Sequence, residues 1–224
     1  MKIKAIAIDI DGTLTNELRR FDLEAVQKVR EIEARGVPVI LATGNILCIT
    51  ESAAIFIGTS GCLIAENGGV IKNIKNDETL YLGNLKKVEK AFEFLSKKIK
   101  VQKVARSELR KTEIAIYRTV DAAEVKKLLK GFDVGVVDTK FAIHIKDSNV
   151  SKGKALLKVA KIMGIKPSEI AAIGDSENDR EMLECAGYAI SVGEEKLRNV
   201  SDFVTRGSLG KGGREALEHV IKLL

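Results

Sequence analysis

The first strand-like run of this sequence, Ile3 to Ile8, is nearly all aliphatic, and an acidic residue, Asp9, follows it. Strands that are buried on both faces of a parallel sheet have this composition. Parallel neighbours are joined by crossover connections, usually helices, which cover the faces of the sheet. We therefore expect an α/β fold with a Rossmann-like parallel-sheet core and helices on both faces.

The residues that follow alternate between helix and strand signals. Asp22 can cap a helix whose apolar residues recur at helical spacing up to Ile32, and Gly36 can end it. Further elements are predicted as a strand at 37–42, a helix through Phe56, a strand at 62–65 and a turn at 67–69.

The pattern changes after Leu82. Helical spacing predicts a helix over 85–99, and Asp121 can cap a second helix that ends at Lys130. Alternating polarity predicts strands over 112–118, 132–137 and 140–146. This order is typical of an antiparallel sheet with helices on one face. We therefore predict a small inserted α+β domain.

The alternation of helices and strands resumes at Lys152. We expect helices over 152–163, stopping at Gly164, and over 180–185, strands over 170–173, 188–192 and 202–205, and a terminal helix after 210–213. The chain thus divides into a core, residues 1–82 and 152–224, and an insertion, residues 83–151. An insertion of about seventy residues is within the usual size of a domain.

Composition narrows the class of protein. The 224 residues are 45% hydrophobic and 30% charged, which excludes a disordered chain. No apolar run is long enough for a membrane span, and Asp9 interrupts the N-terminal run as no signal peptide does. We therefore expect a cytoplasmic protein with no membrane partner.

Cysteine and histidine offer little chemistry in this chain. Cys48, Cys62 and Cys185 lie far apart and form no Cys-x-x-Cys pair, so neither a disulfide framework nor a structural zinc site is expected. We interpret His144 and His219 as ordinary residues on the faces of a strand and a helix. If the chain is an enzyme, its carboxylates and lysines carry the reaction.

The net charge of +6 is unevenly distributed. Between Asn84 and Lys130 there are 14 Lys and Arg residues against 6 Asp and Glu, a net charge of +8. This segment has few aromatic residues and no nucleic-acid-binding signature, so we expect no nucleic-acid partner. The excess is either solvated helical surface or a field that attracts small anions, and the two interpretations are compatible.

Four acidic residues follow predicted strands. Asp9 and Asp11 come after the first strand, where alternate residues of extended backbone point the same way. Asp175 and Asp179 follow the strand at 170–173. Open α/β sheets bind ligands beyond the carboxyl ends of their strands. If the two strands are neighbours, four carboxylates converge there.

Such a cluster requires either a cation or protonated acids. A donor set made of oxygen atoms alone favours a hard cation, so we predict Mg²⁺. Two further segments suit a phosphate group. Thr43-Gly44-Asn45 offers a hydroxyl, backbone N–H groups and an amide near a helix start. The ammonium of Lys152 can lie among the acids from the start of its helix, and Lys154 is the alternative.

These motifs resemble the four ordered motifs of the haloacid dehalogenase superfamily, and the resemblance covers the whole chain. The motifs stand at 9–13 (Asp-Ile-Asp-Gly-Thr), 43–44 (Thr-Gly), 152–153 (Lys-Gly) and 174–179 (Gly-Asp-Ser-Glu-Asn-Asp). The insertion and the Glu66-Asn67-Gly68 turn are similar to those of Cof-type phosphatases with an α/β cap. The short cap and total length are most similar to the archaeal phosphoglycolate phosphatases.

The resemblance implies a Mg²⁺-dependent phosphomonoester hydrolase that forms an aspartyl-phosphate. Because the family pattern places its lysine directly before glycine, it selects Lys152 over Lys154. The resemblance implies that Asp9 is the nucleophile and that Asp11 is first the acid and later the base. It implies that the phosphoryl group is bound by Thr43, Gly44, Asn45 and Lys152, and that Asn178 has a positioning role. The implied ligands of Mg²⁺ are the Asp9 carboxylate, the Asp11 backbone carbonyl, Asp175 and, directly or through water, Asp179.

The expected substrate is a small anionic phosphomonoester, with 2-phosphoglycolate preferred. Many Cof-type members have arginine after Thr-Gly, whereas this chain has Asn45, which fits a small substrate better than a large sugar phosphate. Other interpretations remain open: a sugar-phosphate or mannosyl-phosphoglycerate phosphatase, a phosphomutase, or a basic nucleic-acid-binding protein with a decayed site. A monomer and a homodimer are both compatible with the sequence.

Overall fold

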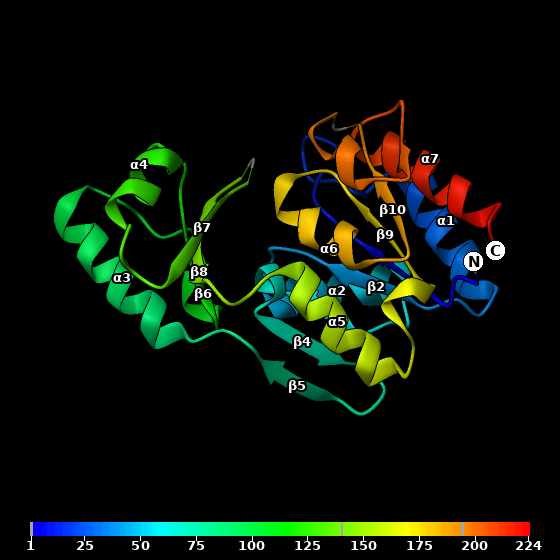
Figure 1. Ribbon diagram of the computed structural model, residues 1–224, viewed down its shortest axis with the longest axis horizontal. Coiled ribbons are helices and arrows are strands. Elements are labelled where there is room, and N and C mark those ends of the chain that lie inside the picture. Colours follow the sequence, from blue (N-terminus) through cyan, green and yellow to red (C-terminus); the bar gives the residue numbers. More distant parts are fainter. Residues whose placement is uncertain (1, 140, 194) are drawn as a thin grey trace.

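The computed structural model describes residues 2–139, 141–193 and 195–224. In this part of the chain the strands form one eight-stranded and one three-stranded sheet (Figure 1). The elements of the larger sheet and its surroundings are β1 (Ala5–Ile8), α1 (Leu23–Ala34), β2 (Val39–Ala42), α2 (Leu47–Ile57), β3 (Leu63–Ala65), β4 (Val70–Asn73), β5 (Glu78–Tyr81), α5 (Lys152–Met163), β9 (Ile170–Gly174), α6 (Arg180–Cys185), β10 (Tyr188–Ser191), β11 (Phe203–Val204) and α7 (Leu209–Ile221).

The larger sheet has the strand order β11-β10-β9-β1-β2-β3-β4-β5. The first six strands in this order are parallel, whereas β4 and β5 are antiparallel to their neighbours. The predicted parallel core with helices on both faces is confirmed. The β4–β5 hairpin was not predicted, because three of the four β5 residues are polar or aromatic and stand half-exposed or exposed, which weakens the hydrophobic signal.

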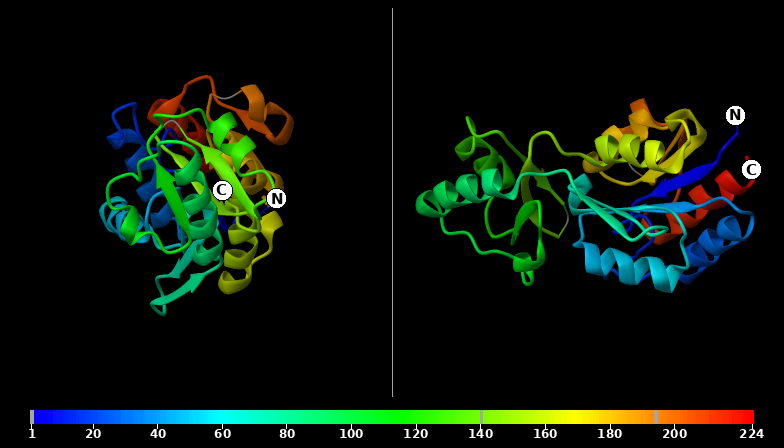
Figure 2. Two further views of the ribbon diagram at one scale, coloured as in Figure 1. Left: turned by 90° about the vertical axis from the view of Figure 1, so that its left-hand side faces the viewer. Right: turned by 90° about the horizontal axis from the view of Figure 1, so that it is seen from below.

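Strand β1 shows why the sheet is covered on both sides. Its alternate residues Ile6 and Ile8 belong to an apolar cluster with α1, α2 and α7. Ala5 and Ala7 belong to a second cluster with α5 and α6. Figure 2 shows these two helix layers above and below the sheet. A strand without exposed faces is therefore aliphatic throughout, as its sequence indicated.

The smaller sheet and two helices form a separate body, which we call the cap. Its elements are α3 (Leu85–Lys98), β6 (Glu113–Ile116), α4 (Ala122–Leu128), β7 (Val134–Asp138) and β8 (Ile143–Asp147). The strands run antiparallel in the order β6-β8-β7. Ile114 and Ile145 pack with Val88 and Leu95 of α3 in one apolar cluster. The order of elements predicted for the insertion is confirmed, although Lys140, in the third predicted strand, lies outside the described residues.

The cap stands at the end of the core where the parallel strands finish, opposite the two chain termini (Figures 1 and 2). Residues 82–84 and 148–151 connect the two bodies. We propose that the predicted boundaries, 82/83 and 151/152, divide core from cap.

The terminal helix begins earlier than predicted, at Leu209, and includes the glycine-rich run at 210–213. In the described residues, we find no helix with the length and apolar character needed to cross a bilayer.

Candidate active site

Strand pairing brings three of the four predicted acids together. Strands β1 and β9 are parallel neighbours in which Ile8 pairs with Ile173. The Asp9 N–H donates to the Ile173 carbonyl at 3.0 Å, which holds the residue after β1 beside the end of β9. Carboxylate oxygens of Asp9, Asp175 and Asp179 lie within 4.8 Å of one another, and all three residues are buried.

Gly12 allows this close approach. Its φ of +95° lies in the left-handed region, and a Cβ there would lie 2.4 Å from Oδ2 of Asp175. A larger residue would therefore displace the Asp175 carboxylate.

Lys152 lies between two of the acids. Its Nζ is 2.5 Å from Oδ1 of Asp9 and 2.6 Å from Oδ1 of Asp179, and its side chain is 0% exposed. The other Asp179 oxygen accepts the N–H groups of Asp175 and Ser176, both at 3.1 Å. Asp179 therefore orients both Lys152 and the loop that carries Asp175.

Lys154 does not reach this cluster. It is exposed, and its backbone N–H donates at 3.2 Å to Oγ of Ser151, the residue that caps the start of α5. Residues two apart on a helix lie about 200° apart around its axis, so the two lysines face opposite sides. The structure therefore places Lys152, and not Lys154, among the acids.

The cluster has unusual electrostatics. Burial raises the pKa of Asp9 well above its usual value, and the neighbouring acids add to this although Lys152 opposes it. Burial lowers the pKa of Lys152, but Asp179 and Asp9 outweigh that effect and raise it. Lys152 is therefore a fixed positive charge, and the remaining negative charge creates a demand for a further cation.

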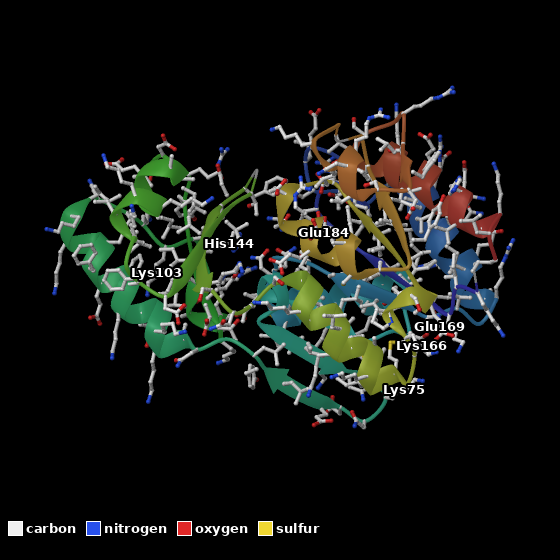
Figure 3. All side chains as sticks on the ribbon, viewed as in Figure 1. Lys75, Lys103, His144, Lys166, Glu169 and Glu184 are labelled. Carbon is white, nitrogen blue, oxygen red and sulfur yellow. The ribbon has the colours of Figure 1, made fainter. Side chains whose placement is uncertain are left out.

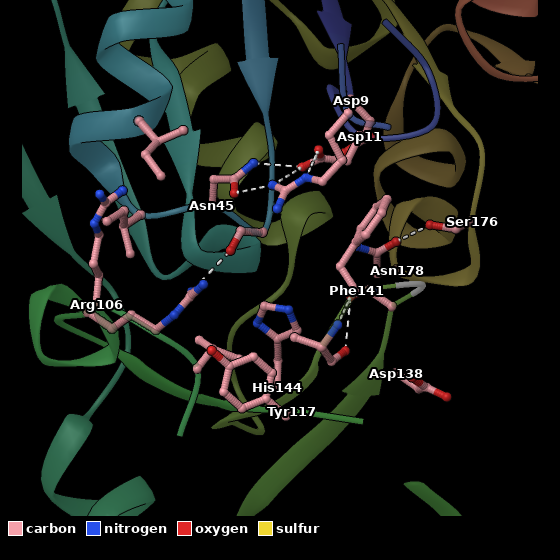
Figure 4. Close-up of a pocket in the computed structure, with 18 of the residues that line it drawn as sticks. Asp9, Asp11, Asn45, Arg106, Tyr117, Asp138, Phe141, His144, Ser176 and Asn178 are labelled. Carbon is pink, nitrogen blue, oxygen red and sulfur yellow. Dashed lines mark hydrogen bonds and ion pairs between the residues drawn. The ribbon is translucent and has the colours of Figure 1, made fainter. Parts of the chain in front are cut away.

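Asp11 has different partners. Its carboxylate accepts Nε of Arg19 at 2.8 Å, Nη2 of Arg19 at 3.2 Å and Nδ2 of Asn45 at 2.6 Å (Figure 4). It stands apart from the three-acid cluster, and its side chain is 17% exposed. Metal ligation by the Asp11 backbone carbonyl stays a prediction. Arg19 was not identified from the sequence, since it lies in a loop without periodicity.

The Thr43-Gly44-Asn45 segment bends back on itself after β2. The hydroxyl oxygen of Thr43 accepts both the Asn45 N–H, at 3.1 Å, and its side-chain amide, at 3.0 Å. The Gly44 carbonyl accepts Nη1 of Arg110 from the cap at 3.0 Å. Asn45 has its donors directed to Thr43 and Asp11, and its contact with phosphate stays a prediction.

Asn178 lies on the opposite wall (Figure 4). It donates from Nδ2 to Oδ1 of Asn67 at 3.2 Å and accepts the hydroxyl of Ser176. It therefore links the loop after β9 to the Glu66–Gly68 turn, while a contact between Asn178 and substrate stays a prediction.

A cavity of about 490 Å³ lies between core and cap. Asp9, Asp11 and Asp175 line it from the core. The residues that line it from the cap include Arg106, Arg110, Tyr117, Phe141 and His144. The arrangement places a buried carboxylate and a second, more accessible carboxylate at one end of the cavity, and the Lys152 ammonium contacts the buried one.

Comparison with known proteins assigns the family. Residues 6–119 and 84–208 match the haloacid dehalogenase-like hydrolase model in two overlapping segments. A phosphoglycolate phosphatase of Methanothermobacter thermautotrophicus is 46% identical over 217 residues, 96% of this chain and 97% of that protein. One of Archaeoglobus fulgidus is 45% identical over 219 residues, 97% of this chain and 96% of that protein.

The chain belongs to the haloacid dehalogenase-like hydrolases. Within that family it is a phosphatase, as the relatives similar along nearly its whole length are. A crystal structure from Thermoplasma acidophilum has the same fold, with a TM-score of 0.91, 24% identity and 100% coverage of both chains. A haloacid dehalogenase-like hydrolase from B. subtilis has a TM-score of 0.78 at 23% identity, over 97% of this chain and 100% of its own.

His144 lies on a strand face, as the sequence indicated, but that face is buried. Its neighbours Ile143 and Ile145 face the apolar side of the cap sheet, so His144 faces the core. Figure 3 shows it on the core side, with Lys103 farther out beside the helices of the cap. His144 is buried, and its Nδ1 lies 2.7 Å from Oε1 of Glu113. Treating it as an ordinary strand residue missed that its face closes a cavity.

Glu113 is the buried centre of a contact between cap and core. It pairs with Arg110 and His144 and accepts Nδ2 of Asn67 at 2.9 Å. Burial favours its protonated form, but the charges of His144 and Arg110 outweigh this and lower its pKa to about 2. The cap face of the hydrolase is therefore electrostatically tied to the core turn.

A second contact holds the same two loops together. The Glu66 carboxylate accepts the N–H groups of Lys111 and Thr112, at 3.0 and 2.8 Å, and the Thr112 hydroxyl at 2.7 Å. Burial is the main cause that raises the pKa of Glu66. Glu66 and Asn67 have left-handed φ angles of 50° and 54°. The turn after β3 thus anchors the cap beside the cavity.

Proposed function

We propose that this phosphatase hydrolyses 2-phosphoglycolate to glycolate and phosphate through an aspartyl-phosphate on Asp9. The observation that carries the mechanism is that two neighbouring carboxylates have different surroundings, which suit them to different roles. Asp9 is buried against the Lys152 ammonium at 2.5 Å, whereas Asp11 is held by Arg19 and Asn45 at the open side of the cavity. The names of the relatives support the substrate.

The reaction requires two proton transfers at one residue. An Asp9 oxygen attacks phosphorus while the bond from phosphorus to the ester oxygen breaks, and Asp11 in its protonated form gives that oxygen a proton. Water then attacks the aspartyl-phosphate, Asp11 takes a proton from the water, and the bond between Asp9 and phosphorus breaks. Phosphate leaves and both carboxyl groups return to their starting states.

Phosphoryl oxygens need donors that do not move during the reaction. An ammonium has three N–H donors, and the Asp9 and Asp179 contacts use two of those on Lys152. The third can hold a phosphoryl oxygen. The Thr43 hydroxyl oxygen accepts from Asn45, so its proton is available for a second phosphoryl oxygen, beside the Gly44 N–H.

The acids fit the Mg²⁺ that is general in this superfamily. Asp9, Asp175 and Asp179 supply closely spaced carboxylate oxygens, and burial together with the neighbouring acids raises the pKa of Asp9 although Lys152 opposes it. Oxygen donors alone suit a hard cation. Mg²⁺ would reduce the repulsion between the Asp9 carboxylate and the anionic phosphate ester.

Removal of the metal should silence the enzyme reversibly. In excess EDTA we expect no measurable hydrolysis, and added Mg²⁺ should restore it. Asp175→Asn removes one ligand charge, so its half-saturating Mg²⁺ concentration should rise roughly tenfold or more. Calorimetric titration with Mg²⁺ gives the affinity without turnover. Full activity in EDTA, or unchanged Mg²⁺ affinity in Asp175→Asn, would contradict this metal site.

The substrate proposal is tested by comparing two phosphomonoesters. We expect kcat/KM for 2-phosphoglycolate to exceed that for glucose 6-phosphate roughly ten- to a hundredfold, because one charge-assisted contact to the carboxylate accounts for that ratio. Raised salt should reduce the advantage if long-range attraction contributes. A higher kcat/KM for the sugar phosphate would favour the sugar-phosphate alternative, and phosphate transferred to a sugar instead of water would favour a phosphomutase.

A further inference from the structure

The loop between β1 and α1 is built around Arg19. Thr15 and Phe21 form an isolated antiparallel bridge at its base. Inside it, Oδ1 of Asn16 accepts the N–H groups of Leu18 and Arg20, both at 3.0 Å, and the Asn16 carbonyl accepts the Arg19 N–H at 2.9 Å. Arg19 has a left-handed φ of 59°, which costs a non-glycine residue on the order of 1 kcal/mol.

This turn directs the Arg19 guanidinium between core and cap. It contacts both oxygens of Asp11, and Nη2 also donates to Oδ1 of Asn45 at 2.8 Å. Its central carbon lies 4.8 Å from the ring centroid of Phe141 in the cap. Among the described residues the remaining nitrogen, Nη1, has no hydrogen-bond partner. Arg19 lines the cavity with its side chain 43% exposed.

The chemistry of the leaving group restricts where its charge can lie. In 2-phosphoglycolate one carbon separates the ester oxygen from the carboxylate. Asp11 must reach the ester oxygen to protonate it, so the substrate carboxylate lies close to Asp11 as well. Once Asp11 has given its proton to the ester oxygen, its carboxylate and that of the leaving group lie side by side, and such a pair needs a cation close to both. Arg19 is a cation in direct contact with Asp11.

We infer that Arg19 binds the leaving-group carboxylate through Nη1 while Nε and Nη2 hold Asp11, and so determines specificity for short, carboxylated phosphomonoesters. This inference rests on the proposed function. The Arg19 contact with Asn45 also puts a guanidinium beside the residue that stands where many Cof-type phosphatases carry arginine.

The two cap arginines that line the cavity fit this task less well. Among the described residues, Arg110 bonds through Nη1 to Glu113 and the Gly44 carbonyl, whereas Arg19 is the arginine that contacts Asp11. Arg106 lies on the far side of the cavity from Asp9 and Asp11 in Figure 4.

The test compares 2-phosphoglycolate with 2-phosphoglycolamide, which has nearly the same shape without the carboxylate charge. In Arg19→Ala both rates should fall, because Asp11 loses its partner. The ratio of kcat/KM for the acid to that for the amide should fall a further ten- to a hundredfold. Dividing by the wild-type ratio removes the difference in leaving-group chemistry. Calorimetric binding of phosphoglycolate to Asp9→Asn protein should weaken by a similar factor when Arg19→Ala is added.

Arg20→Ala is the matched control, since it removes a neighbouring exposed arginine and should leave both rate constants unchanged. An unchanged ratio in Arg19→Ala, with both rates reduced equally, would overturn the inference and leave Arg19 a positioning residue for Asp11. A ratio that falls in Arg106→Ala but not in Arg19→Ala would also overturn it. Wild-type enzyme with no preference for the acid would instead refute the proposed substrate, and this inference with it.

Discussion

Asp9→Asn should abolish turnover. We expect kcat to fall roughly 10⁴-fold or more, which is the size of effect that removal of a catalytic nucleophile has on kcat. The amide has nearly the shape of the carboxylate but is a far poorer nucleophile, so no covalent intermediate forms. The Asp9 N–H bond to Ile173 involves the backbone and remains, so the fold should be retained. Initial rates on phosphoglycolate, with thermal unfolding as a check of folding, measure this effect.

Asp77→Asn provides a matched control. Asp77 has a 93% exposed side chain and a left-handed φ of 60°, which asparagine tolerates, so this substitution makes the same chemical change far from the cavity. It should leave kcat and KM unchanged. Appreciable turnover by folded Asp9→Asn protein would show that the reaction does not proceed through Asp9.

Lys152→Ala should reduce kcat/KM by roughly 10³-fold and also destabilise the protein. It removes the ammonium that contacts Asp9 and Asp179 and leaves three buried acids uncompensated, and breaking a buried ion pair costs about 3–5 kcal/mol. Urea unfolding and steady-state kinetics measure the two effects. Saturating Mg²⁺ should recover part of the stability, since it restores positive charge, but not the rate.

Lys154→Ala separates this role from a general effect of losing a lysine. Lys154 lies two residues later in the same helix but is exposed. Its removal should therefore change kcat/KM less than about twofold and the free energy of unfolding by less than about 0.5 kcal/mol. If Lys154→Ala were the more damaging variant, the assignment of the phosphoryl-binding lysine would have to be reversed.

Local patterns were sufficient for most elements of the core. The predicted helix at 152–163 and its stop at Gly164 match α5, because Ser151 caps its start and Gly164 adopts a left-handed φ of 68° at its end. The Asp22 cap of α1 is likewise present, with the side chain accepting the Ala25 N–H. These features depend on residues within one turn of each other, and such residues are adjacent in the sequence.

The cap shows the limit of pattern reasoning. Alternation in residues 143–147 correctly predicted a strand, and it placed His144 on the face opposite Ile143 and Ile145. It did not say whether solvent or another body covers that face, so His144 was interpreted as an ordinary residue. The net charge of the segment likewise did not say which of its cations face the cavity. Of the described lysines and arginines between Asn84 and Lys130, Arg106 and Arg110 line it.

By itself, the sequence determined the α/β alternation, the acids after two strands and the membership of the phosphatase family, because burial periodicity and short motifs are properties of neighbouring residues. The tertiary structure alone decided that Asp9 lies against Lys152, that Arg19 and Asn45 hold Asp11, and that Glu113 pairs with His144 across the cap sheet. These pairs join residues 8 to 143 positions apart. Strand order and the docking of the cap bring them together, and both follow from burying apolar surface over the whole chain, which no local pattern specifies.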